Sequence, residues 1–340
     1  MNTTELEATV RAMTARGKGL LAADESSGTI KKRFDSIGLE STETNRRDYR
    51  QMLFTTDGLE QAISGVILYD ETLRQSTDDG RTLAGILQAK GIVPGIKVDK
   101  GTIAMAPGSA EKLTEGFDGL ARRYEEYYQL GARFAKWRAV YSISDHLPST
   151  RNMLLNAQGL ARYAAITQQS GLVPIVEPEV LMDGAHTIER CEEVTTAVLN
   201  AVFAALAAEG VALELMVLKP NMVISGKECA VQASAQQVAA ATVRCFSRTV
   251  PAAVPGIMFL SGGQGDAEAT ANLDAINRLS AHHPWTFSFS YGRALQAPSL
   301  KAWGGKKDNI AAGQKALQKR ALLNGAACRG EYEAKLEQAA

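Results

Sequence analysis

Charged and polar side chains follow several short apolar runs of this sequence. Burying a charge at the end of such a run costs free energy, so a charge found there is expected to have a function. Lys219 ends one apolar run, and Lys97, Lys136 and Glu177 end or interrupt three others. Ser261 follows a fifth run, and the steps between these five positions are 39, 41, 42 and 42 residues. This spacing predicts a repeated strand–helix unit whose strands deliver polar groups to one place.

The residue types favour a lysine nucleophile over the common alternatives. The sequence has no Gly-x-Ser-x-Gly elbow, so it does not indicate a serine hydrolase. Its four histidines fall in predicted loops and none has ligand spacing at a strand end, so no metal centre is predicted. These histidines are His146, His186, His282 and His283.

A lysine at the end of a buried strand can act on a carbonyl group. A free lysine has a pKa near 10.4, so only about one amine in 2,000 is neutral at pH 7. Burial and a neighbouring cation lower such a pKa, and Lys136 is the candidate cation. The neutral amine of Lys219 would form a Schiff base, an electron sink for breaking or making an adjacent carbon–carbon bond. Glu177 is the candidate acid for the loss of water, and Asp24 is the candidate base for aldehyde departure.

Eight apolar runs alternating with amphipathic segments predict an α/β fold, a (β/α)8 TIM barrel. We expect one domain over residues 1–340, with an extra N-terminal helix at 1–16 and a short C-terminal tail at 327–340. A doubly wound sheet is the rival, but the turn at 22–28 lacks the Gly-x-Gly-x-x-Gly pattern. The expected strands are 20–23, 65–69, 92–98, 132–140, 172–176, 213–218, 256–260 and 285–291. The clearest helical patterns are 117–130, 149–170, 187–209, 234–248 and 266–280.

Two groups of residues are candidate phosphate receptors. The first follows the seventh and eighth strands, where barrels commonly bind phosphate through backbone N–H groups. It comprises Ser261, Gly262, Gly263, Ser290, Gly292 and Arg293. The second comprises Ser26, Thr29, Arg33 and Lys97, and a simple helix cap at Ser26 and Ser27 is an equal alternative there. Two anion sites on either side of a lysine indicate a substrate phosphorylated at both ends.

Composition argues against several other classes of protein. Lysine plus arginine and aspartate plus glutamate both number 37, so no global field would attract nucleic acid or an anionic membrane. No uninterrupted apolar stretch reaches membrane-spanning length, and the acidic, polar N-terminus is not typical of a targeting peptide. The four cysteines are far apart, which indicates neither disulfides nor a zinc site. We therefore expect a cytoplasmic protein.

Eight motifs together resemble the class I fructose-1,6-bisphosphate aldolases, and the resemblance covers roughly residues 15–330. It implies a TIM barrel that reversibly cleaves fructose 1,6-bisphosphate to dihydroxyacetone phosphate and glyceraldehyde 3-phosphate, with no metal or other cofactor. It also implies a homo-oligomer, because members of the family are commonly tetramers. The motifs are Leu21–Ser26, Lys97–Gly101, Ala135–Arg138, Val176–Glu179, Leu218–Met222, Leu260–Gln264, Ser290–Gln296 and Lys301–Lys307.

The resemblance also implies a role for each matching residue. Lys219 would form the Schiff base, Glu177 would handle protons in its formation and hydrolysis, and Asp24 would be the cleavage base. Lys136 and Glu179 would support the charge network, and Arg138 would line the cavity. The ketose-end phosphate would bind Ser261, Gly262, Gly292 and Arg293, and the other phosphate would lie near Ser26, Thr29, Arg33 and Lys97.

The sequence departs from the family pattern at its C-terminal end. Many members have a longer tail whose final tyrosine assists proton transfer at the enamine, whereas the last tyrosine here is Tyr332. We expect Glu179, Glu177 or a substrate phosphate to relay that proton. The departure also leaves open the preference between fructose 1,6-bisphosphate and fructose 1-phosphate.

Three other functions remain as alternatives to this interpretation. A different Schiff-base lyase, of the transaldolase or deoxyribose-phosphate aldolase kind, is the nearest, but the two phosphate receptors and the Leu218–Met222 motif speak against it. A catalytically silent scaffold would be expected to lose Lys219 or Glu177, and both are present. A metal-dependent aldolase is disfavoured because the histidines lack ligand spacing.

Overall fold

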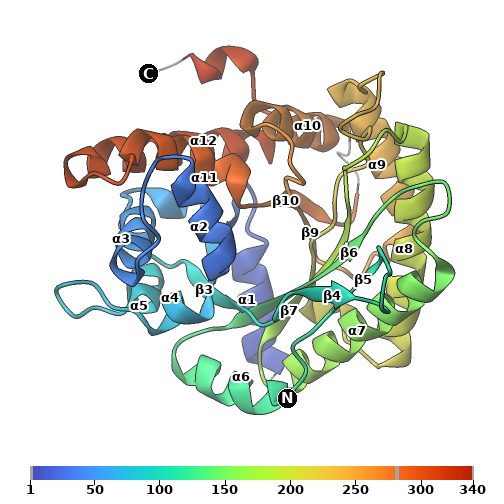
Figure 1. Ribbon diagram of the computed structural model, residues 1–340, viewed down its shortest axis with the longest axis horizontal. Coiled ribbons are helices and arrows are strands. Elements are labelled where there is room, and N and C mark those ends of the chain that lie inside the picture. Colours follow the sequence, from blue (N-terminus) through green and yellow to red (C-terminus); the bar gives the residue numbers. More distant parts are fainter. Residues whose placement is uncertain (1–2, 280–282, 339–340) are drawn as a thin grey trace.

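Eight parallel strands form a closed barrel in the computed structural model, which describes residues 3–279 and 283–338 (Figure 1). Neighbouring strands follow the order of the chain around the barrel, and helices surround it. The predicted α/β fold, a (β/α)8 TIM barrel, is therefore confirmed. The strands are β1 (Gly19–Ala23), β2 (Ile63–Leu68), β3 (Val93–Lys97), β6 (Phe134–Tyr141), β7 (Val173–Val180), β8 (Val217–Leu218), β9 (Gly256–Phe259) and β10 (Thr286–Tyr291).

Several of the helices that cover the barrel begin after a serine or threonine whose side chain accepts a capping hydrogen bond. At the start of α9, for example, the Ser234 hydroxyl accepts from the backbone N–H of Gln237, and the Gln237 side chain accepts from the backbone N–H of Ser234. These two bonds form a capping box. The helices are α1 (Thr3–Met13), α2 (Ser27–Asp35), α3 (Glu43–Phe54), α4 (Asp70–Arg74), α5 (Leu83–Ala89), α6 (Leu120–Gln129), α7 (Thr150–Gln169), α8 (Ile188–Ala208), α9 (Ala235–Thr249), α10 (Asp266–Leu279), α11 (Arg293–Trp303) and α12 (Ile310–Ala327).

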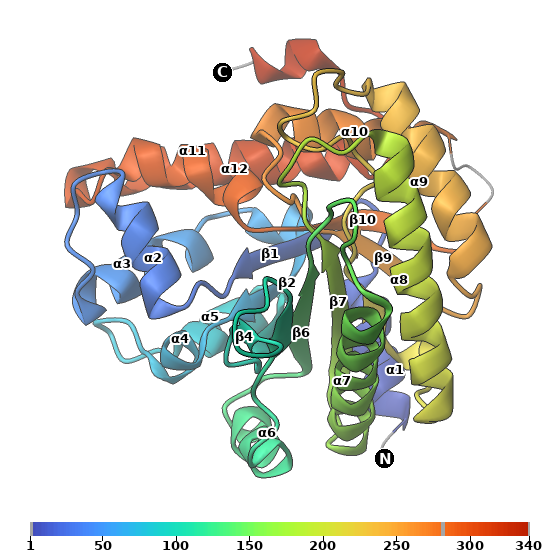
Figure 2. The same cartoon turned by 45° about the vertical axis from the view of Figure 1, so that its right-hand side comes forward.

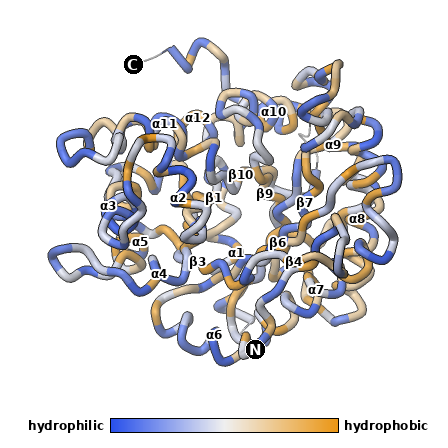
Figure 3. Tube along the Cα trace, in the orientation of Figure 1, coloured by the Kyte–Doolittle hydropathy of each residue, from blue (hydrophilic) through white to orange (hydrophobic). Residues whose placement is uncertain are grey.

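The strands divide the buried apolar residues into two layers because successive side chains point to opposite faces. Outward-facing residues pack against the helices; Trp137 of β6, for instance, stacks on Tyr163 of α7. Inward-facing residues fill the lower barrel together with Leu6, Val10 and Met13 of α1. In Figure 3 hydrophilic residues gather on the outer loops and helix turns, away from this core.

The inward face of each long strand changes from apolar to charged toward its C-terminal end. On β7 the inward series runs from Val173 and Ile175, which belong to the apolar barrel core, to Glu177. On β6 it runs from Phe134 to Lys136. The alternation thus places charges on top of a sealed apolar base, at the end of the barrel where TIM barrels have their active sites.

Two parts of the sequence form structures that the pattern did not predict. The expected strand at 213–218 is wrong over its first half, because Leu213–Leu215 is a 3-10 helix and only Val217–Leu218 is a strand. The Gln168 side chain donates to the carbonyls of Ala212 and Leu215, at 2.8 and 3.1 Å, and so takes the hydrogen bonds of a neighbouring strand. An unpredicted hairpin, β4 (Thr102–Ala104) and β5 (Lys112–Thr114), lies between β3 and α6.

The two chain ends contain the N-terminal helix and the short tail. The helix α1 spans Thr3–Met13 and ends before residue 16, the predicted limit, and residues 1 and 2 lie outside the described residues. At the other end α12 continues to Ala327, and the tail forms a short 3-10 helix at Ala334–Glu337. Residues 339 and 340 of the predicted tail lie outside the described residues.

Among the described residues, α8 alone is long and apolar enough to cross a membrane by length and composition. Half of its apolar window is buried, and α8 packs between α7 and α9 on the outside of the barrel (Figure 2). Cys191 and Cys245 are buried on α8 and α9, and all four cysteines are free thiols. The contacts of α8 with α7, α9 and β7 account for its buried apolar residues.

We predict that Gly95→Ala destabilises the barrel by about 1–3 kcal/mol. A Cβ at position 95 would lie 2.1 Å from the ring of Phe134, which fills the barrel interior. Gly159→Ala on α7 is the matched control, since its Cβ meets nothing within 4 Å and alanine favours helix by up to about 1 kcal/mol. Denaturant unfolding midpoints measure both, and equal midpoints for the two variants would contradict the steric argument.

Candidate active site

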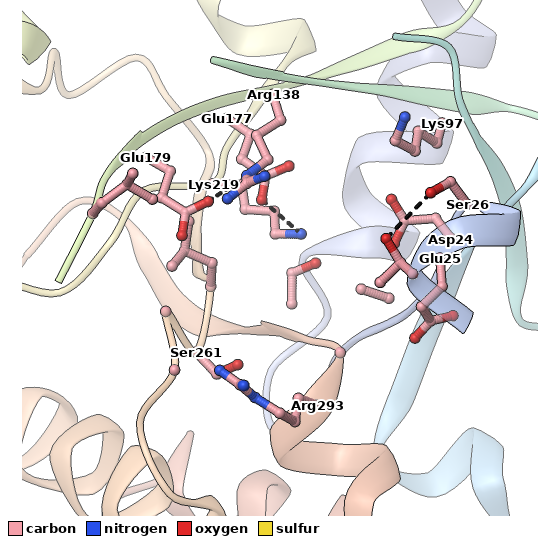
Figure 4. Close-up of a pocket in the computed structure, with 18 of the residues that line it drawn as sticks. Asp24, Glu25, Ser26, Lys97, Arg138, Glu177, Glu179, Lys219, Ser261 and Arg293 are labelled. Carbon is pink, nitrogen blue, oxygen red and sulfur yellow. Dashed lines mark hydrogen bonds and ion pairs between the residues drawn. The ribbon is translucent and has the colours of Figure 1, made fainter. Parts of the chain in front are cut away.

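All sixteen predicted site residues line one cavity of about 730 Å³ at the C-terminal end of the barrel (Figure 4). They come from the ends of seven strands and from the loops that follow them. The structure brings together Asp24, Ser26, Thr29, Arg33, Lys97, Lys136, Arg138, Glu177, Glu179, Lys219, Ser261, Gly262, Gly263, Ser290, Gly292 and Arg293.

The buried Glu177 carboxylate lies between two lysines. Its Oε1 is 3.1 Å from Nζ of Lys219, and its Oε2 is 3.3 Å from Nζ of Lys136. All three side chains are about 5% exposed, so the charges compensate one another away from water. The backbone N–H of Lys219 donates to the carbonyl of Val176 at 2.8 Å, which continues the β7–β8 pairing and fixes the lysine at the strand end.

Lys136 is also paired with Asp24, at 2.7 Å between Nζ and Oδ2, and lies 3.9 Å from Oδ2 of Asp99. Burial would raise the pKa of Asp24, but the charges of Lys136 and Lys219 hold it well below its ordinary range. Burial would lower the pKa of Lys136, but Asp24, Glu177 and Asp99 hold it well above its ordinary value. Asp24 is therefore a carboxylate and Lys136 an ammonium across the neutral range.

A second ion pair, between Arg138 and Glu179, stands beside the first on β6 and β7. Nε of Arg138 donates to Oε2 of Glu179. Burial opposes the charge on Arg138, but Glu179 and Glu177 raise the pKa of the guanidinium above its ordinary value. In Figure 4 Arg138 and Glu179 lie on the same side of the cavity as Glu177 and Lys219.

One end of the cavity has the features of an anion site. The loop after β9 turns at Gly262 and Gly263, which have φ of 56° and 92° and so adopt the left-handed region that favours glycine. The N-terminus of α11, at Gly292 and Arg293, faces the same space and favours negative charge. The buried hydroxyl of Ser290 has no hydrogen-bond partner within the described chain, so it is free to bind a ligand.

The opposite end of the cavity lies at the N-terminus of α2. Ser26 occupies the N-cap position, but its hydroxyl makes no capping bond and lies 3.2 Å from the hydroxyl of Thr29. The Ser26 side chain therefore does not form the simple helix cap that was the alternative to a phosphate site. Lys97 is paired with Asp99 at 2.6 Å, and Arg33 is paired with Glu25.

Sequence reasoning assigned no role to several residues of the site. Glu25 and Asp99 each pair with a predicted cation, and Lys32 and Lys227 add positive charge to the cavity wall. Glu25 and Asp99 lie within the motifs Leu21–Ser26 and Lys97–Gly101. Their closeness in sequence to Asp24 and Lys97 could therefore have identified them. Lys227 lies within the loop between β8 and α9, outside every recognised motif, and gave no such signal.

Two further expectations concern residues away from this cavity. Within residues 3–279 and 283–338, no group of three or more His, Cys, Asp or Glu residues is arranged to hold a metal ion. Tyr332, the last tyrosine, is not among the residues that line the cavity, and its hydroxyl donates to Glu337 at 3.0 Å.

The chain matches the family described as fructose-bisphosphate aldolase class-I over residues 5–340. It is 52% identical to "Fructose-bisphosphate aldolase 4, cytosolic" of Arabidopsis thaliana, covering 98% of this chain and 85% of that protein. It is 56% identical to "Fructose-bisphosphate aldolase 2" of Caenorhabditis elegans, covering 93% and 86%. A crystal structure of fructose-bisphosphate aldolase from Plasmodium falciparum superposes with a TM-score of 0.96 at 52% identity, covering 97% and 96%. The chain belongs to the class I fructose-bisphosphate aldolases, which act through a Schiff base.

Proposed function

We propose that Lys219 is the residue that forms the Schiff base in the reversible cleavage of fructose 1,6-bisphosphate. The observation that supports this most strongly is the position of its amine, buried at the end of β8 and 3.1 Å from Glu177. Lys219 and Glu177 share one proton, which Glu177 takes, so that the neutral amine can attack the ketone carbon. A proton moves from nitrogen to the former ketone oxygen and gives a carbinolamine. Glu177 then gives its proton to the departing hydroxyl, water leaves, and a protonated imine remains.

Asp24 is proposed as the base that cleaves the carbon–carbon bond. It removes the proton of the hydroxyl group on the aldehyde side, and the electron pair of the breaking bond moves into the imine to give an enamine. Its lowered pKa means that it is ionised before the reaction starts. Lys136 maintains that ionisation and moves no proton of its own.

The two ends of the cavity are proposed to bind the two phosphates of the substrate. Backbone N–H groups of the loop after β9 and of the start of α11 would hold the ketose-end phosphate, with Arg293 as a charged partner. Ser26, Thr29, Arg33 and Lys97 would hold the other. The phosphates would then fix the sugar across Lys219, which accounts for the bisphosphate named in the family.

The enamine needs a proton before the product is released, and we propose that Glu179 relays it. Glu179 lines the cavity beside Glu177 and is held by Arg138. Glu177 itself and the substrate phosphate are the other groups within the proposed site. Within the part of the chain that the structure describes, no tyrosine lines the cavity.

We also propose a single domain, a cytoplasmic location and a homo-oligomer, a tetramer by analogy with the family. One continuous apolar core extends from Leu21 to Tyr332, which supports a single domain. The Arabidopsis relative is named cytosolic, which supports the location. The balanced net charge gives no reason to expect nucleic acid or an anionic membrane as a partner. Light scattering of the purified chain would determine the number of subunits.

Lys219→Met is expected to lower the cleavage rate at least about a thousandfold, because the nucleophile is removed. Lys31→Met is the control, since Lys31 is exposed on α2 and pairs with Asp35. The unsubstituted enzyme should keep its full rate in EDTA. Retained cleavage in Lys219→Met, or loss in EDTA, would contradict the proposed function and favour one of the alternatives.

Lys136→Met should shift the acid limb of the cleavage profile to higher pH. The substitution removes the positive charge of Lys136 while Asp24 stays buried, so the pKa of Asp24 would rise. Asp24 would then become protonated at a higher pH than in the unsubstituted enzyme. Lys97→Met should cause a smaller shift, because Lys97 contributes least to the lowered pKa. Profiles of kcat/KM from about pH 5 to pH 9 measure both. An unshifted limb in Lys136→Met would show that another group sets it.

Glu179→Gln is expected to slow the exchange of solvent tritium into dihydroxyacetone phosphate about a hundredfold, because the proton relay is removed. Glu192→Gln provides a control, since Glu192 also pairs with an arginine, Arg244, but away from the cavity. If exchange in Glu179→Gln equals that of the control, Glu177 or the substrate phosphate is the relay.

A further inference from the structure

Glu25 is a buried carboxylate on the cavity wall that the proposed reaction does not use. It is 6% exposed and follows Asp24 at the end of β1. It accepts hydrogen bonds from three side chains on three helices: Arg33 of α2, Arg50 of α3 at 3.1 Å, and Gln296 of α11 at 2.7 Å. Glu25 thus links these three helices to the end of β1.

The donors around Glu25 are themselves fixed. Arg50 is 1% exposed and also donates to the backbone carbonyl of Glu25 at 3.2 Å. Gln296 donates to the carbonyl of Ala22 at 2.6 Å and accepts from the hydroxyl of Tyr49 at 3.0 Å. The Glu25 carboxylate therefore has little freedom to move, and it restricts the guanidinium of Arg33 that donates to it.

Arg33 is the one member of this set that reaches the open cavity, since its side chain is 22% exposed. Its Nη1 donates to Glu25, while its Nη2 would lie 3.6 Å from a Cβ on Gly292 at the start of α11. One edge of the guanidinium is anchored, and the other lies beside Gly292, on the wall of the cavity that Ser26 and Thr29 also line. A single carboxylate faces two guanidinium groups here, so one positive charge is left over for an anion.

We propose that Glu25 is a positioning residue that holds Arg33 against the phosphate bound over the N-terminus of α2. Because that phosphate is absent from fructose 1-phosphate, Glu25 contributes to the preference for a bisphosphate over a ketose with one phosphate. An anchored guanidinium loses less rotamer freedom on binding than a free one. The inference rests on the proposed placement of the two phosphates.

The test compares Glu25→Gln with the unsubstituted enzyme on both substrates. Gln keeps the shape of the side chain but weakens the charge-assisted bond to Arg33, so KM for fructose 1,6-bisphosphate should rise about tenfold. Both kcat and kcat/KM for fructose 1-phosphate should change less than about twofold. Asp35→Asn on the solvent face of α2 removes an exposed ion pair with Lys31 and should change neither substrate.

A double-mutant cycle with Arg33→Ala separates positioning from general destabilisation. If Glu25 acts through Arg33, adding Glu25→Gln to Arg33→Ala should raise KM for the bisphosphate less than about twofold further. Independent, multiplicative effects of the two substitutions on KM, or an equal loss of activity on both substrates in Glu25→Gln, would overturn the inference.

A second variant is used if Glu25→Gln fails to fold. Gln296→Met removes one hydrogen-bond partner of Glu25 and leaves the charge of Glu25 in place. It should raise KM for the bisphosphate about threefold, and an unchanged KM would overturn the inference.

Borohydride reduction with dihydroxyacetone phosphate distinguishes failure of the inference about Glu25 from failure of the proposed function. That substrate has one phosphate, so Glu25→Gln should form the adduct on Lys219 at an unchanged rate. A normal adduct with unchanged KM values would overturn the role of Glu25 alone. Absence of an adduct on Lys219 in the unsubstituted enzyme would overturn the proposed function on which the inference rests.

Discussion

The contact of one buried carboxylate with two buried lysines is the constraint on which the site depends. Glu177 meets Lys219 through one oxygen and Lys136 through the other. A buried charge without a partner is strongly destabilising, so the lysines of the site require carboxylates nearby. Asp99 pairs with Lys97, Asp24 with Lys136, and Glu177 with Lys219. These contacts keep Asp24 ionised and hold the amine of Lys219 in place.

The barrel makes that balance possible by its geometry. The pairing of β6 with β7 sets Arg138 opposite Glu177, and the pairing of β3 with β6 sets Lys97 opposite Lys136. Below them Phe134 fills the interior against Gly95 and Gly65, where no side chain would fit. The apolar lower layer, closed by α1, keeps water from the base of the site. The charged layer therefore rests on a rigid support, and its side chains need not rearrange before substrate binds.

Much of the site could be predicted from sequence because strand ends are local features. Lys219, Glu177 and Lys136 each follow an apolar run, and parallel strands necessarily bring such ends together. The partners of the cations were harder to identify, since Glu25 meets Arg50 and Gln296 only after three helices pack. The first half of the strand expected at 213–218 failed for the same reason: Gln168, which redirects it, lies on a different helix. Contacts between distant segments leave no periodic pattern in the chain.

The most direct measurement of the central claim is peptide mass mapping after borohydride reduction in the presence of dihydroxyacetone phosphate. An imine reduced in place leaves a stable secondary amine on the lysine that formed it. The account predicts one adduct, on Lys219, in the peptide that contains Leu218–Met222. An adduct on Lys136 or Lys97 in place of Lys219 would contradict it, because those two ammonium groups are assigned here to electrostatic support alone.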